Sequence, residues 1–589
     1  MGTVTIHARP TASRARSRAA LIPLTATVLL ATLDASAAAE AKGTYRNPIL
    51  YADYSDPDVV RMGADFYLIA SSFHFSPGIP VLRSHDLVHW SIVGHALANL
   101  DFDPGYDLPG PLDFDDATER SKLNYALGYR YAAGIWAPAI REHDGRLYIY
   151  FVTPTEGIFM TSAPRAEGPW DAPVKVIAQA GLEDPCPFWD DDGQAYLVHS
   201  RVGAGPLILH RMSSDGKRVV DDGKVIVHDP VHLPTLEGPK LYKRNGYYYI
   251  FAPFGGVETG SQAVLRSRNI DGPYDSRTVL SKGTTEVQGP HQGGYVETAS
   301  GEGWFLHFNS TGAYGRIVYL EPVKWEDDWP IIGERLGDTA SGQPVQSHAL
   351  PDVGRTFPAI YPQTSDEFAA RTLGPQWEWN HNPLDSHWSL TERPGFLRLK
   401  AFPAANLVSA RNTLTQMLQG RAVQITARLS VGGMADGQRA GLAMFGRRPS
   451  WIGVVQSEGA RRVTFADGGV ETAGPSLDAV GARPADGGAS STVAGPAAVG
   501  AAAGPRAQRV PAPEFVLLRM RVDNEQAQYS YSLDAGETFT ALGSKARMLF
   551  SWWKAARPAL FTYNTNASAP RAGSADFDWV RVEPLRGEP

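Results

Sequence analysis

Three carboxyl groups stand at the start of similar apolar segments, and their placement suggests acid–base chemistry. Asp56 and Asp184 each precede a proline, Glu237 lies two residues before one, and a fourth such segment starts near His291. Acids are seldom buried without a task or a partner. Carboxyls that converge shift one another's pKa values apart, which separates an acid role from a base role. A turn-forming role would explain one Asp-Pro pair, but it explains three equivalent positions less well.

The segments that must position these residues recur five times between residues 51 and 308. In each copy a proline opens a short apolar strand, a glycine-containing turn follows, and an aromatic strand returns. Asn-Gly and Asp-Gly pairs between apolar runs are strong hairpin signals. The last four copies recur at intervals of roughly fifty residues, as propeller blades do. The longer first interval contains an insertion at 100–121. We therefore predict a five-bladed β-propeller over residues 43–350, whose innermost strands bring the segment openings together around one channel.

The pattern changes after Tyr361-Pro362. Partly alternating apolar segments at 396–399, 423–429, 515–522, 529–533 and 577–582 read as strands. They predict a β-sandwich over residues 364–589. Residues 468–513 are dominated by Ala, Gly and Pro and predict a disordered surface insertion. The expected fold class is all-β, a propeller followed by a sandwich.

Length, charge and cysteine content restrict the number of domains, the class of partner and the cellular location that can be expected. The 589 residues are too many for one ordinary core, and the net charge of −7 gives no reason to expect a nucleic-acid partner. Residues 1–39 read as a signal peptide, with four arginines before an apolar run and a small-residue cleavage pattern, so we expect a secreted or periplasmic protein without a membrane partner. The only cysteine, Cys186, excludes an intrachain disulfide, and we expect it to be buried and unreactive.

A set of motifs extends across the whole first domain. The segments are Asn47-Pro48-Ile49-Leu50 to Val60, Phe66 to Phe73, Gly134 to Ile140, Glu183-Asp184-Pro185 with Asp191-Asp192-Gly193, Leu236 to Pro239, Gly289 to Gly294, and Gly315-Arg316 with Glu321 to Trp325. Together, and in this order, they resemble the motifs of glycoside hydrolase family 43. The C-terminal domain is similar to the concanavalin-like sandwich that the family's β-xylosidase-like members carry.

The resemblance implies a role for each carboxyl. Asp56 matches the general base that activates water, Glu237 the general acid, and Asp184 the residue that tunes the pKa of the acid and positions it. The family inverts anomeric configuration, which requires base and acid to stand about 6.5–9.5 Å apart. Asp58 is a rival for the base, because it would share a strand face with Asp56.

The resemblance also implies a sugar subsite. Phe73 and Trp136 match its aromatic walls, although core packing is the ordinary role of such residues in a β protein. Arg316 matches an arginine that contacts sugar hydroxyls or the acid pair, with a surface salt bridge as the alternative. His291 matches a channel histidine that often holds a water or a divalent ion. No cofactor is implied, and calcium near His291 would be structural rather than catalytic.

The resulting expectation is an exo-acting β-xylosidase that releases xylose from the non-reducing ends of xylo-oligosaccharides or of xylan side structures. The alternatives are an α-L-arabinofuranosidase on arabinoxylan or arabinan, an endo-acting arabinanase if the site is an open groove, and a non-catalytic carbohydrate-binding propeller. A retaining β-fructosidase would need carboxyls about 5–5.5 Å apart, and the Glu-Cys pair expected of its acid is missing. The expected partner is a plant cell-wall oligosaccharide or polysaccharide.

Overall fold

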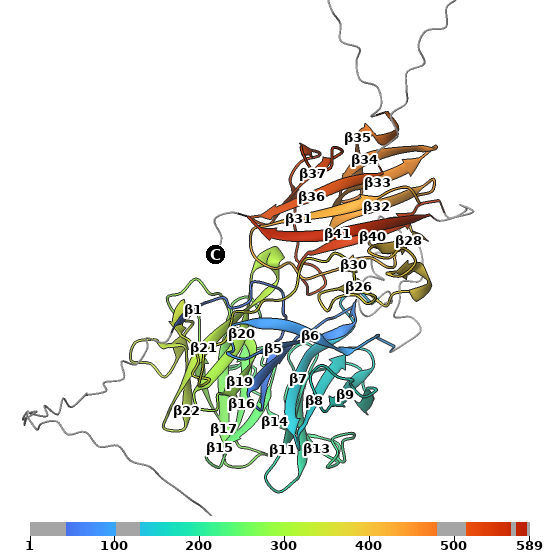
Figure 1. Cartoon of the computed structure of the whole chain (residues 1–589). Coiled ribbons are helices and arrows are strands. Elements are labelled where there is room, and N and C mark those ends of the chain that lie inside the picture. Colours follow the sequence, from blue (N-terminus) through green and yellow to red (C-terminus); the bar gives the residue numbers. More distant parts are fainter. Residues whose placement is uncertain (1–42, 102–129, 480–513, 567–572, 586–589) are drawn as a thin grey trace, which may run out of the picture. The chain divides into compact units, whose positions relative to one another are not determined.

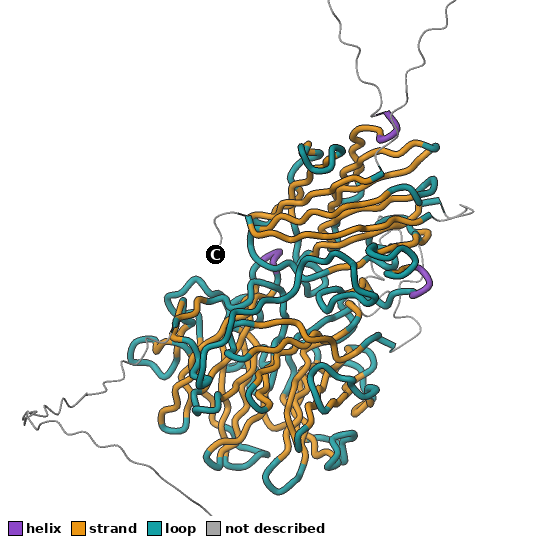
Figure 2. Tube along the Cα trace, viewed as in Figure 1, coloured by secondary structure: helices purple, strands orange, loops and turns teal. Residues whose placement is uncertain are grey.

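The computed structural model describes residues 43–101, 130–479, 514–566 and 573–585 (Figure 1). Strands build both domains, and helix is limited in these residues to three single 3₁₀ turns, at Gly312–Tyr314, Asp385–His387 and Leu477–Ala479 (Figure 2). The predicted signal peptide, most of the insertion at 100–121, and residues 480–513 lie outside the described residues. Among the described residues, no helix is both long and apolar enough to cross a membrane.

The five predicted repeats form five antiparallel sheets, the blades of a propeller. Blade 1 contains β2 (Asp58–Met62), β3 (Asp65–Ile69), β5 (Gly78–Ser84) and β6 (Trp90–Leu97). Blade 2 contains β7 (Trp136–His143), β8 (Arg146–Thr153), β9 (Gly157–Ala163) and β10 (Val174–Ile177). Blade 3 contains β11 (Leu182–Trp189), β12 (Ala195–Arg201), β13 (Leu207–Met212) and β14 (Lys224–Val227). Blade 4 contains β15 (Lys240–Arg244), β16 (Tyr247–Phe254), β17 (Ser261–Ser267) and β18 (Asp275–Leu280), extended by β24 (Gly342–Gln343) and β23 (Glu334–Arg335). Blade 5 contains β19 (His291–Glu297), β20 (Gly303–Ser310), β21 (Arg316–Glu326) and β22 (Trp329–Ile332).

Apolar side chains fill the wedges between neighbouring blades, one cluster to each wedge. Between blades 4 and 5, for example, Tyr249 and Phe251 of β16 pack against Phe305 of β20. The ring closes between blades 5 and 1, where Leu50 pairs with Val318 of β21. Further along, β1 (Thr44–Arg46) pairs with β25 (Ser347–Ala349). Large aromatic residues suit these wedges because each one removes much apolar surface from water.

Each innermost strand is preceded or opened by a residue in the left-handed region of φ. These residues are Asp56 (54°), Ala137 (35°), Asp184 (54°), Gly238 (59°) and Gln292 (37°). The residue before each of them therefore occupies an equivalent place, so Glu237 and His291 correspond to Glu183 rather than to Asp184. The prediction that Asp56, Asp184 and Glu237 hold equivalent positions is thus wrong by one residue for Glu237. The reason is that the left-handed turn, and not the acid, sets the register of the repeat.

Two sheets form the C-terminal sandwich. One has the order β35 (Val470–Ser476), β34 (Ala460–Asp467), β33 (Ser450–Ser457), β32 (Gln438–Phe445), β40 (Arg557–Asn564), β30 (Leu414–Thr415), β26 (Glu378–Asn380) and β4 (Phe75–Ser76), with β29 (Phe402–Pro403) beside β40. The other has the order β27 (Trp388–Ser389), β28 (Leu397–Lys400), β41 (Ser574–Pro584), β31 (Val423–Ser430), β36 (Phe515–Asp523), β37 (Gln526–Ser532) and β38 (Thr540–Ala541), with β39 (Ala546–Arg547) beside β37. One large apolar cluster fills the space between them.

The start of the predicted disordered insertion is ordered. Residues 470–476 form β35, which pairs with β34 from Asp467 and Val470 onward. Gly468 (φ 57°) and Gly469 (φ 88°) make the two-residue hairpin turn, for which positive φ at both positions is required. The prediction for 468–476 is therefore wrong, because this Gly-Gly pair is turn chemistry rather than low complexity.

The two domains share structure. Strand β4 leaves blade 1 and pairs with β26 in the sandwich sheet, and the residues from 43 onward belong to one compact unit. The region around Phe75 is therefore formed by both the propeller and the sandwich.

Candidate active site

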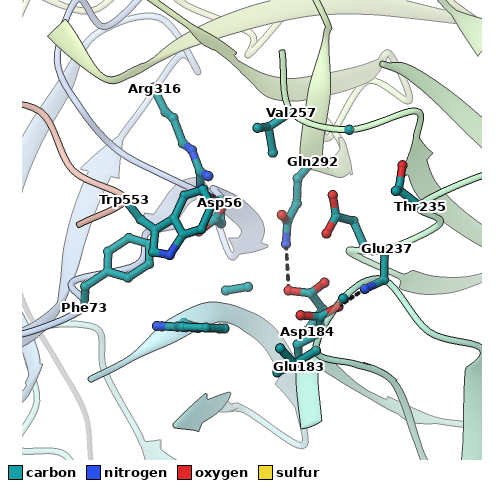
Figure 3. A pocket seen from close by; sticks show the side chains of 16 residues that line it. Asp56, Phe73, Glu183, Asp184, Thr235, Glu237, Val257, Gln292, Arg316 and Trp553 are labelled. Atoms are coloured by element: carbon teal, nitrogen blue, oxygen red, sulfur yellow. Dashed lines mark hydrogen bonds and ion pairs between the residues drawn. The ribbon is translucent and has the colours of Figure 1, made fainter. Parts of the chain in front are cut away.

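A cavity of about 450 Å³ opens where the innermost strands begin (Figure 3). Six of the seven predicted site residues line it, and His291 does not. The lining also includes residues that the sequence analysis did not identify. The residues are Asp56, Phe73, Trp136, Ala137, Glu183, Asp184, Val202, Gly203, Ala204, Thr235, Glu237, Gly256, Val257, Gln292, Arg316 and Trp553.

Asp56 is held by two strong partners. Arg316 Nη1 donates to Oδ1 at 2.7 Å, and Ser71 Oγ donates to Oδ2 at 2.6 Å. Ser71 Oγ in turn accepts the N–H of Ala137 at 2.7 Å, so its proton is directed to the carboxylate. The side chains of Asp56 and Arg316 are each 7% exposed. This arrangement orients the Asp56 carboxylate within the cavity wall.

Glu237 lies across the cavity from Asp56, beside two further carboxyls (Figure 3). Carboxylate oxygens of Glu183, Asp184 and Glu237 lie within 4.8 Å of one another. Asp184 accepts the N–H of Gly238 at 2.8 Å and an N–H of Gln292 at 3.4 Å. Asp184 therefore connects the blade that carries it to the residue next to Glu237.

Crowding and burial favour the protonated forms in this cluster. Burial first, and then the charge of Glu237, raise the pKa of Asp184 to about 7. Burial, followed by the charges of Asp184 and Glu237, raises the pKa of Glu183 to about 9. Carboxyls this close bind protons as a group. The cluster therefore retains protons near neutral pH, as a site that protonates a leaving group requires.

Glu183 was missed in the sequence analysis, although a signal was present. Glu183 directly precedes Asp184-Pro185, just as Glu237 directly precedes Gly238-Pro239. Alignment of the repeats on the proline places both glutamates at the same position of adjacent blades.

Three aromatic residues shape the cavity. Phe73 (φ 50°) and Trp136 lie with ring centroids 6.4 Å apart. Backbone bonds between Phe73 and Ile135, both 2.9 Å, place Phe73 beside blade 2. This close approach requires Gly134, where a Cβ atom would lie 1.6 Å from the Phe73 carbonyl oxygen.

The third aromatic residue, Trp553, comes from the sandwich. It is 45% exposed and lies 5.7 Å from the Arg316 guanidinium. Its neighbour Lys554 pairs with Asp53 at 3.0 Å, and both side chains are almost fully buried. Asp53 also accepts the N–H of Arg316 at 2.9 Å. One buried ion pair thus connects the sandwich loop to the arginine that holds Asp56. Trp553 was missed because nothing in the sequence places this loop over the propeller.

Asp58 is not among the residues that line the cavity. It is fully buried and accepts hydrogen bonds from Arg141 Nη1 at 2.7 Å and from the Ile140 N–H at 2.9 Å. Because Asp56 lines the cavity and Asp58 does not, the structure favours Asp56 as the base. Cys186 is buried as predicted, 3.0 Å from Arg141 Nη2.

His291 is fully buried, and its Nε2 lies 2.9 Å from Glu237 Oε1. Calcium prefers six to eight oxygen ligands. Within the described residues, the only cluster with metal-ligand spacing is Glu183, Asp184 and Glu237, and it does not include His291. The side chains around His291 therefore do not fit a calcium cage, and His291 contacts Glu237 instead.

Both domains match family models. Residues 45–109 and 113–330 match glycosyl hydrolases family 43, and residues 365–477 and 480–583 match the beta xylosidase C-terminal concanavalin A-like domain.

Similar proteins support the same assignment. A protein of Xylanibacter ruminicola is 45% identical over 67% of this chain and 70% of its own length. A protein of Formosa agariphila named beta-xylosidase is 31% identical and covers 92% of this chain and 91% of its own. A Bacteroides ovatus protein named non-reducing end alpha-L-arabinofuranosidase is 32% identical over 61% of this chain and 65% of its own.

The fold is also found in solved structures. The bifunctional GH43-CE structure from Bacteroides eggerthii superposes with a TM-score of 0.75 at 28% identity, and the match covers 92% of this chain and 64% of that one. The chain belongs to glycosyl hydrolases family 43 and is a glycoside hydrolase, built as a five-bladed propeller with a concanavalin-like C-terminal domain.

Proposed function

We propose that this glycoside hydrolase is an inverting exo-β-xylosidase. The observation that carries the proposal is the pairing of an oriented carboxylate, Asp56, with the proton-retaining cluster around Glu237 on the far side of one aromatic-lined cavity (Figure 3). General acid–base catalysis of glycoside hydrolysis needs these two groups.

Asp56 is the general base. Its carboxylate takes a proton from a water molecule, whose oxygen then attacks the anomeric carbon. Arg316 and Ser71 keep the carboxylate in one orientation. Their hydrogen bonds also disperse its charge before the proton arrives.

Glu237 is the general acid, and it transfers its proton to the glycosidic oxygen as the bond to the anomeric carbon breaks. Asp184 and His291 hold it in place, Asp184 through the Gly238 N–H and His291 by direct contact. Once ionised, Asp184 repels a negative charge on Glu237 and so favours the protonated acid.

The substrate class and the exo mode rest on the sandwich domain and on the relatives. Trp553 narrows the cavity from one side, which suits a chain end better than a polymer passing through. The Formosa relative, matched over nearly its whole length, is named a beta-xylosidase. These features support release of xylose from plant cell-wall xylo-oligosaccharides.

An α-L-arabinofuranosidase is the second candidate, because the Bacteroides ovatus relative has that name. The same base and acid would serve either sugar. Family membership leaves the non-catalytic propeller and the β-fructosidase without support.

We also propose that the protein acts outside the cytoplasm, in the medium or the periplasm. The proposal rests on the arginine-rich and then apolar sequence of residues 1–39. Cell fractionation with an antibody against the sandwich would test it, and a full-length cytoplasmic product would contradict it.

The central test is hydrolysis of paired 4-nitrophenyl β-D-xylopyranoside and α-L-arabinofuranoside by the wild type and Glu237→Ala. We expect higher kcat/KM on the xyloside and a loss of about 10²–10⁴-fold in the variant. Glu142→Gln is the matched control. Glu142 is exposed and lies near the end of strand β7 that is opposite to Trp136, the β7 residue that lines the cavity. A wild type without activity on either substrate, or a variant as fast as the wild type, would refute the proposal.

A further inference from the structure

Glu183 is an additional carboxyl in the cavity, and the acid–base mechanism gives it no task. It occupies the position in blade 3 that Glu237 occupies in blade 4, and it is 7% exposed. Its side chain lines the same cavity as Asp56 and Glu237. A buried carboxyl at this place needs a partner or a function.

The contacts of Glu183 involve only one of its oxygens. Oε1 accepts the N–H of Ala204 at 2.9 Å and the hydroxyl of Ser200 at 3.3 Å. No hydrogen bond to Oε2 is found within the described part of the chain. The anchored Oε1 fixes the rotamer, and Oε2 is left available to the cavity that Glu183 lines.

The charges around Glu183 favour a neutral acid. No Lys or Arg of the described residues forms an ion pair with it, whereas Arg316 pairs with Asp56 at 2.7 Å. Asp184 and Glu237 lie beside it, and both burial and neighbouring carboxyls disfavour ionisation. The raised pKa described above agrees with this geometry. Because Oε1 accepts two hydrogen bonds, the proton belongs on Oε2.

We propose that Glu183 is a substrate-binding residue that donates a hydrogen bond from its Oε2–H to a hydroxyl of the bound sugar. The proposal rests on the exo-β-xylosidase function proposed above and adds a specificity contact to it. A neutral donor serves this place well, because it binds a hydroxyl without adding a negative charge beside Glu237.

Two variants distinguish a hydrogen-bond donor to the sugar from a charged or purely structural Glu183. Glu183→Gln keeps an oxygen for Ala204 and Ser200 and an N–H donor for the sugar. We expect its kcat/KM to stay within about threefold of the wild type and its pH profile to be unchanged. Glu183→Ala removes the donor, and we expect KM to rise about tenfold with kcat less affected. Glu142→Gln again serves as the control, and the melting temperature of each variant shows whether it folds.

Deoxy substrates identify the hydroxyl. We expect the KM penalty of Glu183→Ala to disappear on the one deoxy-xyloside, among the 2-, 3- and 4-deoxy compounds, that lacks the accepting hydroxyl. An additive penalty on all of them would overturn the proposal. So would an unchanged KM in a folded Glu183→Ala, or an alkaline limb that moves to lower pH in Glu183→Gln, which would indicate a charged Glu183.

Failure of the proposed function would be visible separately. A wild type that hydrolyses neither chromogenic sugar would refute the exo-β-xylosidase proposal alone. Titration calorimetry of xylose and arabinose with the wild type and Glu183→Ala would then test the sugar-binding role of Glu183. Weaker binding by the variant would support it, whereas equal binding or none by either protein would overturn it.

Discussion

Removal of the Lys554 charge is expected to destabilise the protein and disturb the active site together. The Lys554 side chain is 1% exposed, and its Nζ lies 3.0 Å from Asp53 Oδ2. The same ammonium donates to the carbonyl oxygens of Asp53 at 2.9 Å and Ser71 at 3.3 Å. Burial alone would raise the pKa of Asp53, but Lys554 and the backbone N–H groups of Arg316 and Ala555 outweigh it and lower that pKa. Lys554→Met therefore leaves a buried carboxylate without its cation.

Breaking one partner of a buried pair costs about 3–5 kcal/mol. We expect a loss of this size in urea unfolding followed by tryptophan fluorescence. We also expect a higher KM, because Trp553 and Arg316 lose their common support. The double variant Asp53→Asn/Lys554→Met should lose less than Lys554→Met alone, since no isolated charge remains.

The control is an exposed pair. Arg581 and Glu367 lie 2.9 Å apart with side chains about half exposed, so Arg581→Ala should cost about 0–1 kcal/mol. Equal losses in Lys554→Met and Arg581→Ala would refute the reasoning, as would a double variant less stable than Lys554→Met.

Three further outcomes are expected. The first product of xyloside hydrolysis should be the α-anomer by proton NMR, and initial β-xylose would contradict an Asp56 base with an intervening water. Asp184→Asn should move the alkaline limb of kcat/KM to lower pH, because the cluster of Glu183, Asp184 and Glu237 then has one negative charge fewer above about pH 7; an unmoved limb would contradict a role for Asp184 in the pH dependence. Burial opposes ionisation of Glu378, but Arg557 and His95 lower its pKa to about 2, so its contribution to stability should be complete above about pH 4.5 and disappear as the pH falls toward 2. Glu378→Gln should flatten that acid dependence of the urea midpoint, and an unchanged slope would contradict this assignment.

The repeats could be predicted from the sequence because their information is local. Each Gly-containing turn between two apolar runs specifies a hairpin by itself, and strands β2 and β3, β7 and β8, and β11 and β12 follow those hairpins. Five copies of one unit that cannot bury both faces alone must stack, so the architecture followed from counting them. The error at 468–476 was also local, because Gly-Gly serves both a hairpin turn and a linker.

The active site was only partly predictable. Residue type and position in the repeat were enough to select Asp56, Asp184 and Glu237. Alignment of the repeats on their prolines already matches Glu237 with Glu183, and the positive φ of Gly238 and Asp184 establishes this match in the structure. The choice between Asp56 and Asp58 also required the structure, because only the structure shows that Asp56 lines the cavity and that Asp58 does not.

The sequence by itself determined the propeller, its five units and the carboxyls at their openings, because hydrophobic alternation and turn chemistry act over a few residues. Only the tertiary structure decided which carboxyl groups line one cavity and that Trp553 of the sandwich also lines it. It also decided that Lys554 contacts Asp53, which lies about five hundred residues away in the chain. Such contacts depend on the packing of distant segments, and side-chain type does not encode the segment that will lie opposite.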